Sequence, residues 1–286
     1  MRLSDELAVI DCNAFLGNWA VRSLRHTTAP ELVAMMDRFG IERACVARAD
    51  AILYRDCQAG NERLYNETRR YAERFWLYAT VNPAYAGWQR DLQRCVDLGF
   101  AAIRLYPQYH GYGLDSREAA ALADAAVEAG LPVSAACRVE GVRQRHWLDT
   151  TENLDLADFV RFAEAHPKGT YILTEAYLGA QAGDSIWERL KEVAIHFELS
   201  RMTSLLDNPL GRIQRILGAE RLLFGTGFPF KCPSPAFLKV QVLDASETEK
   251  RLITNGNARR IFQADPRSEG CRRTSCPNRG PGRATI

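Results

Sequence analysis

Histidine, glutamate and arginine occur together in one long polar segment of this chain. The segment reads CRVEGVRQRHW and contains Glu140, Arg143 and His146, while another histidine, His110, lies in YPQYHGYG. Histidine titrates near neutral pH and a nearby carboxylate can fix its tautomer, so these residue types can form a general acid and base. We therefore predict that His110, Glu140 and His146 are catalytic. The alternative is a solvated loop that carries ordinary surface ion pairs.

Other polar residues are predicted to bind substrate. Arg143 can clamp a carboxylate with two parallel hydrogen bonds. Glu175 and Glu198 end the apolar runs TYILTEAY and AIHFEL, and an enclosed glutamate beside another carboxylate would have a raised pKa. The alternative for these glutamates is that they pair with Arg104 or Arg138 and hold the site rigid. The predicted substrate-binding residues are Asn13, Arg104, Tyr109, Arg143, Glu175 and Glu198.

Short apolar runs alternate with longer helical patterns along the chain, and the runs recur about every 30 residues, the length of one βα unit. The runs span residues 8–12, 43–47, 75–81, 101–106, 132–137, 171–174, 195–199 and 221–225. The alternation predicts an α/β fold, a single-domain (β/α)8 TIM barrel whose functional face is built by the loops after the strands. An open doubly wound sheet is the alternative, but DCNAFLGNW after the first run lacks the glycine-rich turn of that fold.

The composition, with 47% apolar and 25% charged residues among 286, is that of a globular protein with a substantial core. Residues 265–286 differ, because Arg, Pro, Gly, Ser and Thr replace nearly all core-forming residues. We therefore predict a barrel over residues 1–264 and a disordered basic tail over residues 265–286. The tail carries five arginines against two acidic residues while the whole chain has a formal net charge of +2, so the barrel is close to neutral.

A near-neutral barrel offers no electrostatic footprint for nucleic acid or an anionic membrane. No stretch approaches the roughly 18 consecutive apolar residues of a transmembrane helix. The eight cysteines include no C-x-x-C pair and fit a reducing compartment. We therefore expect a cytoplasmic protein that binds a small-molecule substrate and neither nucleic acid nor membrane. The sequence leaves the oligomeric state open, a homo-oligomer included.

Five segments resemble the strand ends of one enzyme superfamily. They are VIDCNAFLG at 9–17, GFAAIRLYPQYHGYGLD at 99–115, GLPVSAAC at 130–137, RLLFGTGFPF at 221–230 and NGNARRIF at 255–262. In this order they resemble the amidohydrolase superfamily, in particular its amidohydrolase-related branch, which includes the aminocarboxymuconate semialdehyde decarboxylase type. The resemblance runs over residues 8–263 and implies a hydrolase or decarboxylase-like enzyme that acts on a small carboxylate- or carbonyl-containing substrate.

The resemblance also implies a divalent metal at the carboxyl ends of the strands, but most of the ligands are replaced. The family's metal positions fall on Asn13, Phe15, Ala136, Glu175 and Gly227. A catalytic zinc takes three protein ligands, so we predict a degenerate metal site and no cofactor, with His, Glu and Arg side chains doing the chemistry. A weak divalent site remains as an alternative, built from Asp11, Asn13, Glu175 and Glu198. A metal-free pseudoenzyme that binds a small molecule or a protein partner is the alternative from another functional class.

Overall fold

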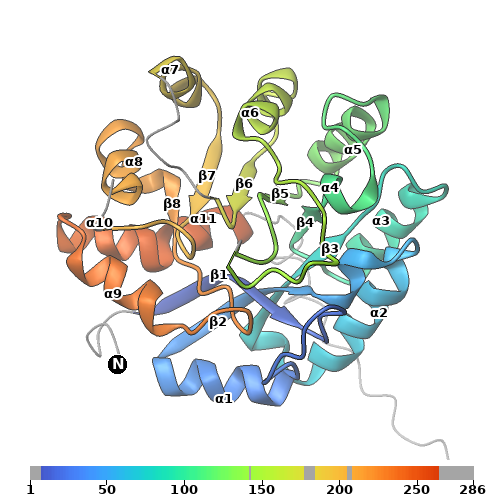
Figure 1. Ribbon diagram of the computed structural model, residues 1–286, viewed down its shortest axis with the longest axis horizontal. Coiled ribbons are helices and arrows are strands. Elements are labelled where there is room, and N and C mark those ends of the chain that lie inside the picture. The colour runs from blue at the N-terminus through green and yellow to red at the C-terminus, as the bar shows by residue number, and fades with distance from the viewer. Residues whose placement is uncertain (1–7, 142, 177–183, 205–207, 264–286) are drawn as a thin grey trace, which may run out of the picture.

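The strands form one closed parallel barrel. The computed structural model describes residues 8–141, 143–176, 184–204 and 208–263 (Figure 1), so the predicted tail at 265–286 lies outside the described residues. The eight strands follow one another around the sheet in chain order. They are β1 (Val9–Leu16), β2 (Ile41–Arg48), β3 (Phe75–Thr80), β4 (Ala102–Leu105), β5 (Val133–Ala136), β6 (Tyr171–Thr174), β7 (Ile195–Glu198) and β8 (Leu222–Leu223). The N–H groups of Cys12 and Phe15 donate to the carbonyls of Phe224 and Phe228, both at 2.8 Å, and close β1 onto the chain after β8. The predicted (β/α)8 barrel is confirmed.

A ring of helices surrounds the barrel (Figure 1). They are α1 (Ala29–Phe39), α2 (Cys57–Thr68), α3 (Trp88–Asp97), α4 (Pro107–His110), α5 (Arg117–Glu128), α6 (Leu156–Ala165), α7 (Asp184–Glu192), α8 (Pro209–Leu217), α9 (Ser234–Val242), α10 (Glu247–Arg251) and α11 (Asn257–Phe262). α5 begins where the Ser116 side chain accepts from the N–H of Ala119, and α1 ends at Gly40, whose φ of 72° permits the left-handed turn into β2. Within the described residues, the structure has no helix long and apolar enough to cross a membrane.

Two groups of buried apolar side chains make the core. One lies between the strands and the helices, and the other fills the barrel with residues such as Ile10, Tyr78, Ile172 and Leu223. Polar side chains are buried at the carboxyl ends of the strands instead, and the pairing of β1 with β2 shifts register between Asp11 and Ala14. The apolar filling therefore gives way to a polar layer at the face where barrel enzymes carry their sites.

Candidate functional site

Three strand ends bring an amide and two carboxylates into direct contact. Asn13 comes from β1, Glu175 follows β6 and Glu198 ends β7. The Asn13 Nδ2 group donates to Glu175 Oε1 at 2.6 Å and to Glu198 Oε2 at 2.9 Å, and none of the three side chains is exposed by more than 1%. We call these residues, together with Ser200, Arg201 and Lys231, the strand-end centre. Asn13, Glu175, the segment 198–201 and Lys231 lie far apart in the sequence and meet because parallel strands end at one face.

Arg104 fixes the orientation of the Asn13 amide. It is fully buried on β4, and its Nη1 donates to Asn13 Oδ1 at 2.9 Å. The guanidinium carbon lies 3.9 Å from the centre of the Tyr78 ring, which holds the cation in place. Because a guanidinium has only donors, the amide oxygen must face Arg104 and the amide nitrogen must face the two carboxylates.

Glu175 is an anion held by two cations. Lys231 Nζ lies 2.5 Å and Arg201 Nε 2.8 Å from Glu175 Oε2. Burial acts to raise the pKa of Glu175, but the positive charges of Lys231 and Arg201 outweigh it and lower the pKa to about 2. Glu175 therefore stays charged throughout the physiological range, against the expectation that enclosure would raise its pKa. The sequence alternative named Arg104 or Arg138 as partners, whereas the ion pairs of Glu175 are with Lys231 and Arg201.

Glu198 has the opposite shift. Burial and the negative charge of Glu175 raise the pKa of Glu198, as the sequence predicted for an enclosed glutamate beside another carboxylate. The Ser200 hydroxyl lies 2.9 Å from Glu198 Oε2, and Lys231 Nζ donates to the same hydroxyl at 2.7 Å. Two neighbouring carboxyl groups with pKa values pushed apart are the usual arrangement of an acid and its charged partner.

Asp11 lies just below this centre. It accepts from the Asn13 N–H at 2.9 Å and from the Thr226 N–H at 2.9 Å and hydroxyl at 2.5 Å. Burial raises the pKa of Asp11 to about 7 even though these donors oppose the shift. Asp11 thus ties the end of β1 to the chain after β8.

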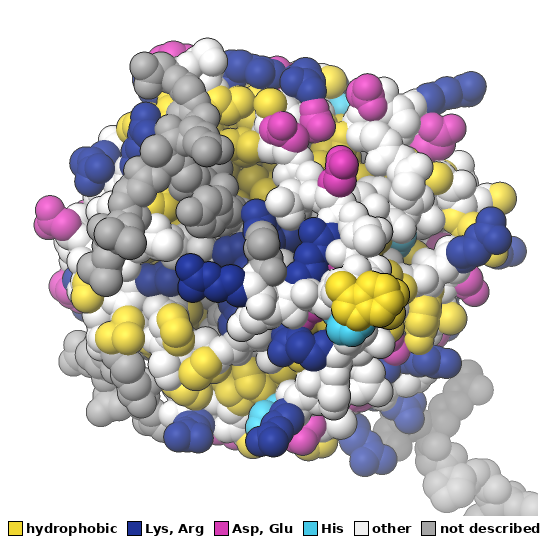
Figure 2. Space-filling view, viewed as in Figure 1, with side chains coloured by type: hydrophobic (Ala, Val, Ile, Leu, Met, Phe, Trp, Pro, Cys, Tyr) yellow, Lys and Arg dark blue, Asp and Glu magenta, His cyan; other side chains and the backbone are white. Residues whose placement is uncertain are grey.

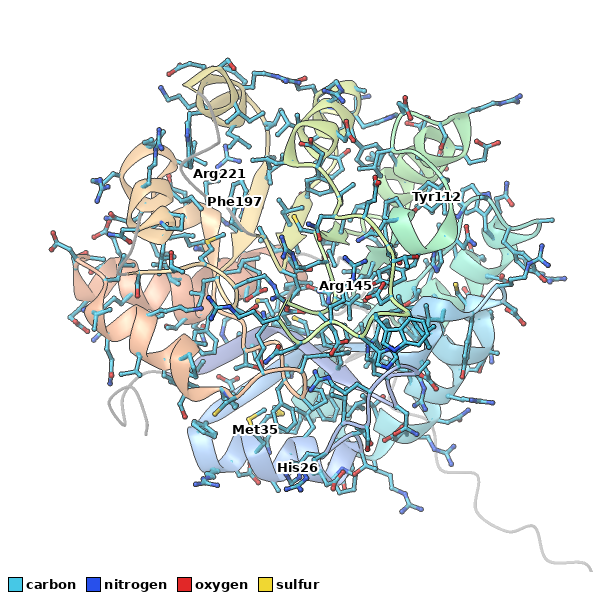
Figure 3. The ribbon with its side chains drawn as sticks, in the orientation of Figure 1. His26, Met35, Tyr112, Arg145, Phe197 and Arg221 are labelled. Atoms are coloured by element: carbon cyan, nitrogen blue, oxygen red, sulfur yellow. The ribbon has the colours of Figure 1, made fainter. Side chains whose placement is uncertain are left out.

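Positive charge gathers over the mouth of the barrel. Figure 2 shows Lys and Arg side chains in the middle of this face, and Figure 3 places Arg145 of the β5–α6 loop there. Burial and the neighbouring positive charge of Arg201 lower the pKa of Arg138, with a further contribution from Arg145. Cations that destabilise one another at a barrel mouth favour an anionic ligand.

The predicted catalytic residues have separate partners. His110 Nε2 lies 3.0 Å from the Ile52 carbonyl oxygen and 3.8 Å from Cys57 Sγ, and burial lowers its pKa to about 4. The buried Glu140 accepts from Trp19 Nε1 at 3.0 Å and from Arg22 Nε at 2.6 Å. His146 Nδ1 accepts from the N–H of Leu148 at 3.2 Å within its own loop.

The Tyr112 ring stacks on His110, and Figure 3 places Tyr112 toward the rim of the barrel. Arg145, the residue before His146, lies away from Tyr112 in the same view. The common catalytic role of His110, Glu140 and His146 therefore stays a prediction.

The predicted substrate-binding residues divide into two groups. Asn13, Arg104, Glu175 and Glu198 lie in or against the strand-end centre, as described above. Tyr109 donates its hydroxyl to Asp149 Oδ2 at 3.1 Å and packs edge-on against Trp19, while Arg143 is exposed. The substrate roles of both groups stay predictions.

Sequence reasoning missed Ser200, Arg201 and Lys231. Ser200 and Arg201 come two and three residues after Glu198, and Lys231 follows the GTGFPF segment after β8. The available signal was position, because residues just after barrel strands face the mouth whatever their type.

Solved structures share the fold at low sequence identity. A 2,6-dihydroxybenzoate decarboxylase from Rhizobium has 18% identity over 90% of this chain and 99% of its own, with a TM-score of 0.67. A dihydroxybenzoic acid decarboxylase from Polaromonas, with bound manganese and 2-nitroresorcinol, has 17% identity over 90% and 97%, with a TM-score of 0.67. A probable 2-pyrone-4,6-dicarboxylic acid hydrolase from Acinetobacter baumannii, with citric acid bound, has 12% identity over 90% and 100%, with a TM-score of 0.65.

The manganese in one of these structures raises the question of whether this chain could hold a divalent metal. The manganese in the Polaromonas structure gives no support to the expectation of no cofactor. It is compatible with the alternative of a weak divalent site at Asp11, Asn13, Glu175 and Glu198. The donor chemistry here fits a metal poorly. Asn13 presents its nitrogen to the carboxylates, and Glu175 already binds Lys231 and Arg201. Among the residues that the structure describes, no three His, Cys, Asp or Glu side chains group as a ligand set.

The family is established by a direct sequence comparison. No curated protein sequence matches the chain. A family model described as Amidohydrolase matches residues 15–264, which run from within β1 to just beyond α11. The match covers most of the chain and agrees with the strand-end motifs. The chain belongs to this amidohydrolase family.

Proposed function

We propose that this chain is an enzyme that acts on a small carboxylate-bearing substrate, as a decarboxylase or, second, as a hydrolase. The observation that carries the proposal is the pair Glu175 and Glu198, two buried carboxyl groups whose pKa values are shifted in opposite directions beneath a cationic mouth. The names of the related structures, two decarboxylases of hydroxybenzoic acids and a dicarboxylic acid hydrolase, agree in substrate class.

The cations at the mouth are suited to hold the substrate carboxylate. Arg138 and Arg201 lie close enough for the charge of one to lower the pKa of the other. An arriving carboxylate relieves this repulsion and can take bidentate hydrogen bonds from a guanidinium. Arg143, exposed on the same loop, is proposed to guide the anion inward.

Glu198 is proposed as the proton donor. When the bond from carbon to the carboxylate breaks, its electron pair stays on the carbon, which must then be protonated as CO2 leaves. The raised pKa of Glu198 favours its protonated form, and Ser200 at 2.9 Å, 8% exposed, can relay the proton toward the mouth.

Decarboxylation is favoured over hydrolysis because hydrolysis needs a base to activate water. Glu175, with its pKa lowered to about 2, is a weak base. His110, Glu140 and His146 are kept in the proposal as additional acid and base candidates of the surrounding loops. The cytoplasmic location and the absence of nucleic acid and membrane partners also stay predictions.

The test is turnover of a panel of aromatic and aliphatic mono- and dicarboxylates, followed by CO2 release and mass spectrometry of the products. For any substrate found, Glu198→Gln should lower kcat by about 10² to 10⁴. Glu128→Gln, on the exposed face of α5, is the matched control and should leave kcat unchanged. Retained kcat in Glu198→Gln contradicts the assignment of the proton donor. Carboxylate binding without any turnover across the panel would favour the pseudoenzyme alternative.

A further inference from the structure

Polar partners surround both carboxylate oxygens of Glu175. A carboxylate offers about four acceptor sites. Oε1 of Glu175 accepts from Asn13 Nδ2 at 2.6 Å and from Ser200 Oγ at 3.2 Å. Oε2 accepts from Lys231 Nζ at 2.5 Å and from Arg201 Nε at 2.8 Å. A divalent ion that binds Oε2 of this carboxylate would have to displace a cation that is already paired with it.

Glu198 also has polar partners on both carboxyl oxygens. Its Oε2 atom accepts from Asn13 Nδ2 at 2.9 Å and from the Glu175 N–H at 3.3 Å, and it lies 2.9 Å from Ser200 Oγ, which shares its single proton between the two glutamates. Its Oε1 atom accepts from the Ser200 N–H. The Asn13 amide cannot rotate to offer its oxygen instead, because the fully buried Arg104 donates to that oxygen at 2.9 Å.

Lys231 also fills space beside the carboxylates. A Cβ atom on Gly227 would lie 3.0 Å from Glu175 Oε1 and 3.0 Å from Lys231 Cδ, tighter than an ordinary contact. The resemblance places an aspartate ligand at Gly227, so the lysine stem lies where that side chain would begin. Phe15, at another of the family's ligand positions, packs edge-on against Phe230 at 5.1 Å and presents no donor atom.

From this geometry we infer that the Lys231 ammonium, assisted by Arg201, replaces the divalent cation in the strand-end centre, so that the centre takes up no Mn²⁺ or Zn²⁺ while Lys231 is in place. Lys231 and Arg201 together carry two positive charges, as a divalent ion does. The inference goes beyond the proposed function and does not depend on it, because it concerns which cation neutralises the carboxylates in the free protein.

Metal content and thermal stability of the wild-type protein test the inference without any substrate. The protein is incubated with 1 mM MnCl2 or ZnCl2 (roughly a hundredfold excess over protein), dialysed and analysed for metal. We expect less than about 0.1 metal per chain. We also expect a melting temperature that the added metal shifts by less than about 1 °C, because only a ligand that binds the folded state stabilises it. About one metal per chain, together with a metal-dependent rise in melting temperature, overturns the inference.

Variants of Lys231 sharpen the test. Lys231→Ala removes the ammonium and opens the space, so this variant should melt lower in chelator and regain melting temperature with Mn²⁺, binding about one ion per chain. Lys231→Arg keeps the charge and should bind none, and Lys168→Ala, at an exposed lysine, should behave as wild type. Metal uptake by Lys231→Arg equal to that of Lys231→Ala overturns the inference. If Lys231→Ala does not fold, the wild-type metal content decides. Because turnover is never measured, failure here leaves the proposed decarboxylase activity standing.

Discussion

The strand-end centre and the β5–α6 loop supply polar side chains to the same face by different means. Asn13, Glu175 and Glu198 leave strands whose backbones are fixed by neighbours, and they contact one another across the barrel. In the loop, His146 bonds to its own segment and Arg145 bonds to Asp149 four residues on, at 3.2 Å. Parallel strands thus determine which distant residues meet, whereas a loop can satisfy its polar groups locally.

The difference also appears in charge. The strand-end centre buries charges. Burial and the charge of Glu175 raise the pKa of Glu198, while the charges of Lys231 and Arg201 lower the pKa of Glu175 against the effect of burial. Glu140 in the loop is equally buried, but it pairs with Arg22, whose side chain is 35% exposed. Charges buried in the strand-end centre depend on their partners more strongly than charges that can return to water.

The largest expected effect concerns which region carries the chemistry. If His146 of the β5–α6 loop and His110 at the end of α4 act as acid and base, His110→Ala and His146→Ala should each lower kcat by about 10² to 10⁴, as much as Glu198→Gln. His166→Ala is the matched control, because this histidine lies at the far end of α6. Steady-state kinetics on one substrate compares them. Losses below tenfold for both histidine variants would assign the chemistry to the strand-end centre alone.

The second prediction compares how much one carboxylate contributes to the free energy of unfolding in the strand-end centre and in the β5–α6 loop. Glu175→Gln leaves Lys231 and Arg201, both mostly buried, facing a neutral amide, and should lower the free energy of unfolding by about 3 to 5 kcal/mol. Glu140→Gln should cost only about 1 to 2 kcal/mol, because Arg22 can turn to water. Denaturant unfolding measures both. Equal losses in the free energy of unfolding would mean that a buried carboxylate stabilises the two regions to the same extent.

The fold and part of the centre could be predicted from the sequence for the same reason. Apolar runs at βα spacing favour a barrel, and Glu175 and Glu198 were found because they end such runs. Lys231 was missed because it lies several residues beyond β8, and only the closure of the chain after β8 onto β1 brings it to Glu175. Spacing along the chain does not reveal which side chain of a long loop turns inward.

The third prediction concerns pH. The folded protein holds the Asp11 proton more tightly than the unfolded chain does, since burial raises its pKa from 3.8 to about 7. The resulting stabilisation is complete below about pH 4 and is lost as the pH rises through about 7. Relative to Asp11→Asn, the wild-type free energy of unfolding should therefore fall by up to about 4 kcal/mol between pH 4 and 7.5.

Glu175 contributes with the opposite sign. Its pKa, lowered to about 2, gives stability above its ordinary value of 4.5 that is lost as the pH falls toward 2. The Asp11 comparison is therefore made above pH 4, by urea unfolding of both proteins at each pH. A difference that stays constant with pH would show that Asp11 is already ionised in the folded state.

The smallest effect is expected at Arg143, which is exposed in the loop, in contrast to the fully buried Arg104. Arg143→Ala should leave the free energy of unfolding within about 0.5 kcal/mol of wild type, as surface changes usually do. It should raise KM for a carboxylate substrate about tenfold with kcat unchanged, because the residue holds the anion without touching the reacting bond. Arg143→Lys should recover only part of this loss, since an ammonium lacks the planar fork of a guanidinium. Arg104→Met should instead destabilise the protein, because it removes the buried donor to the Asn13 amide oxygen. An unchanged KM in Arg143→Ala would remove Arg143 from substrate binding and leave Arg138 and Arg201 to hold the carboxylate.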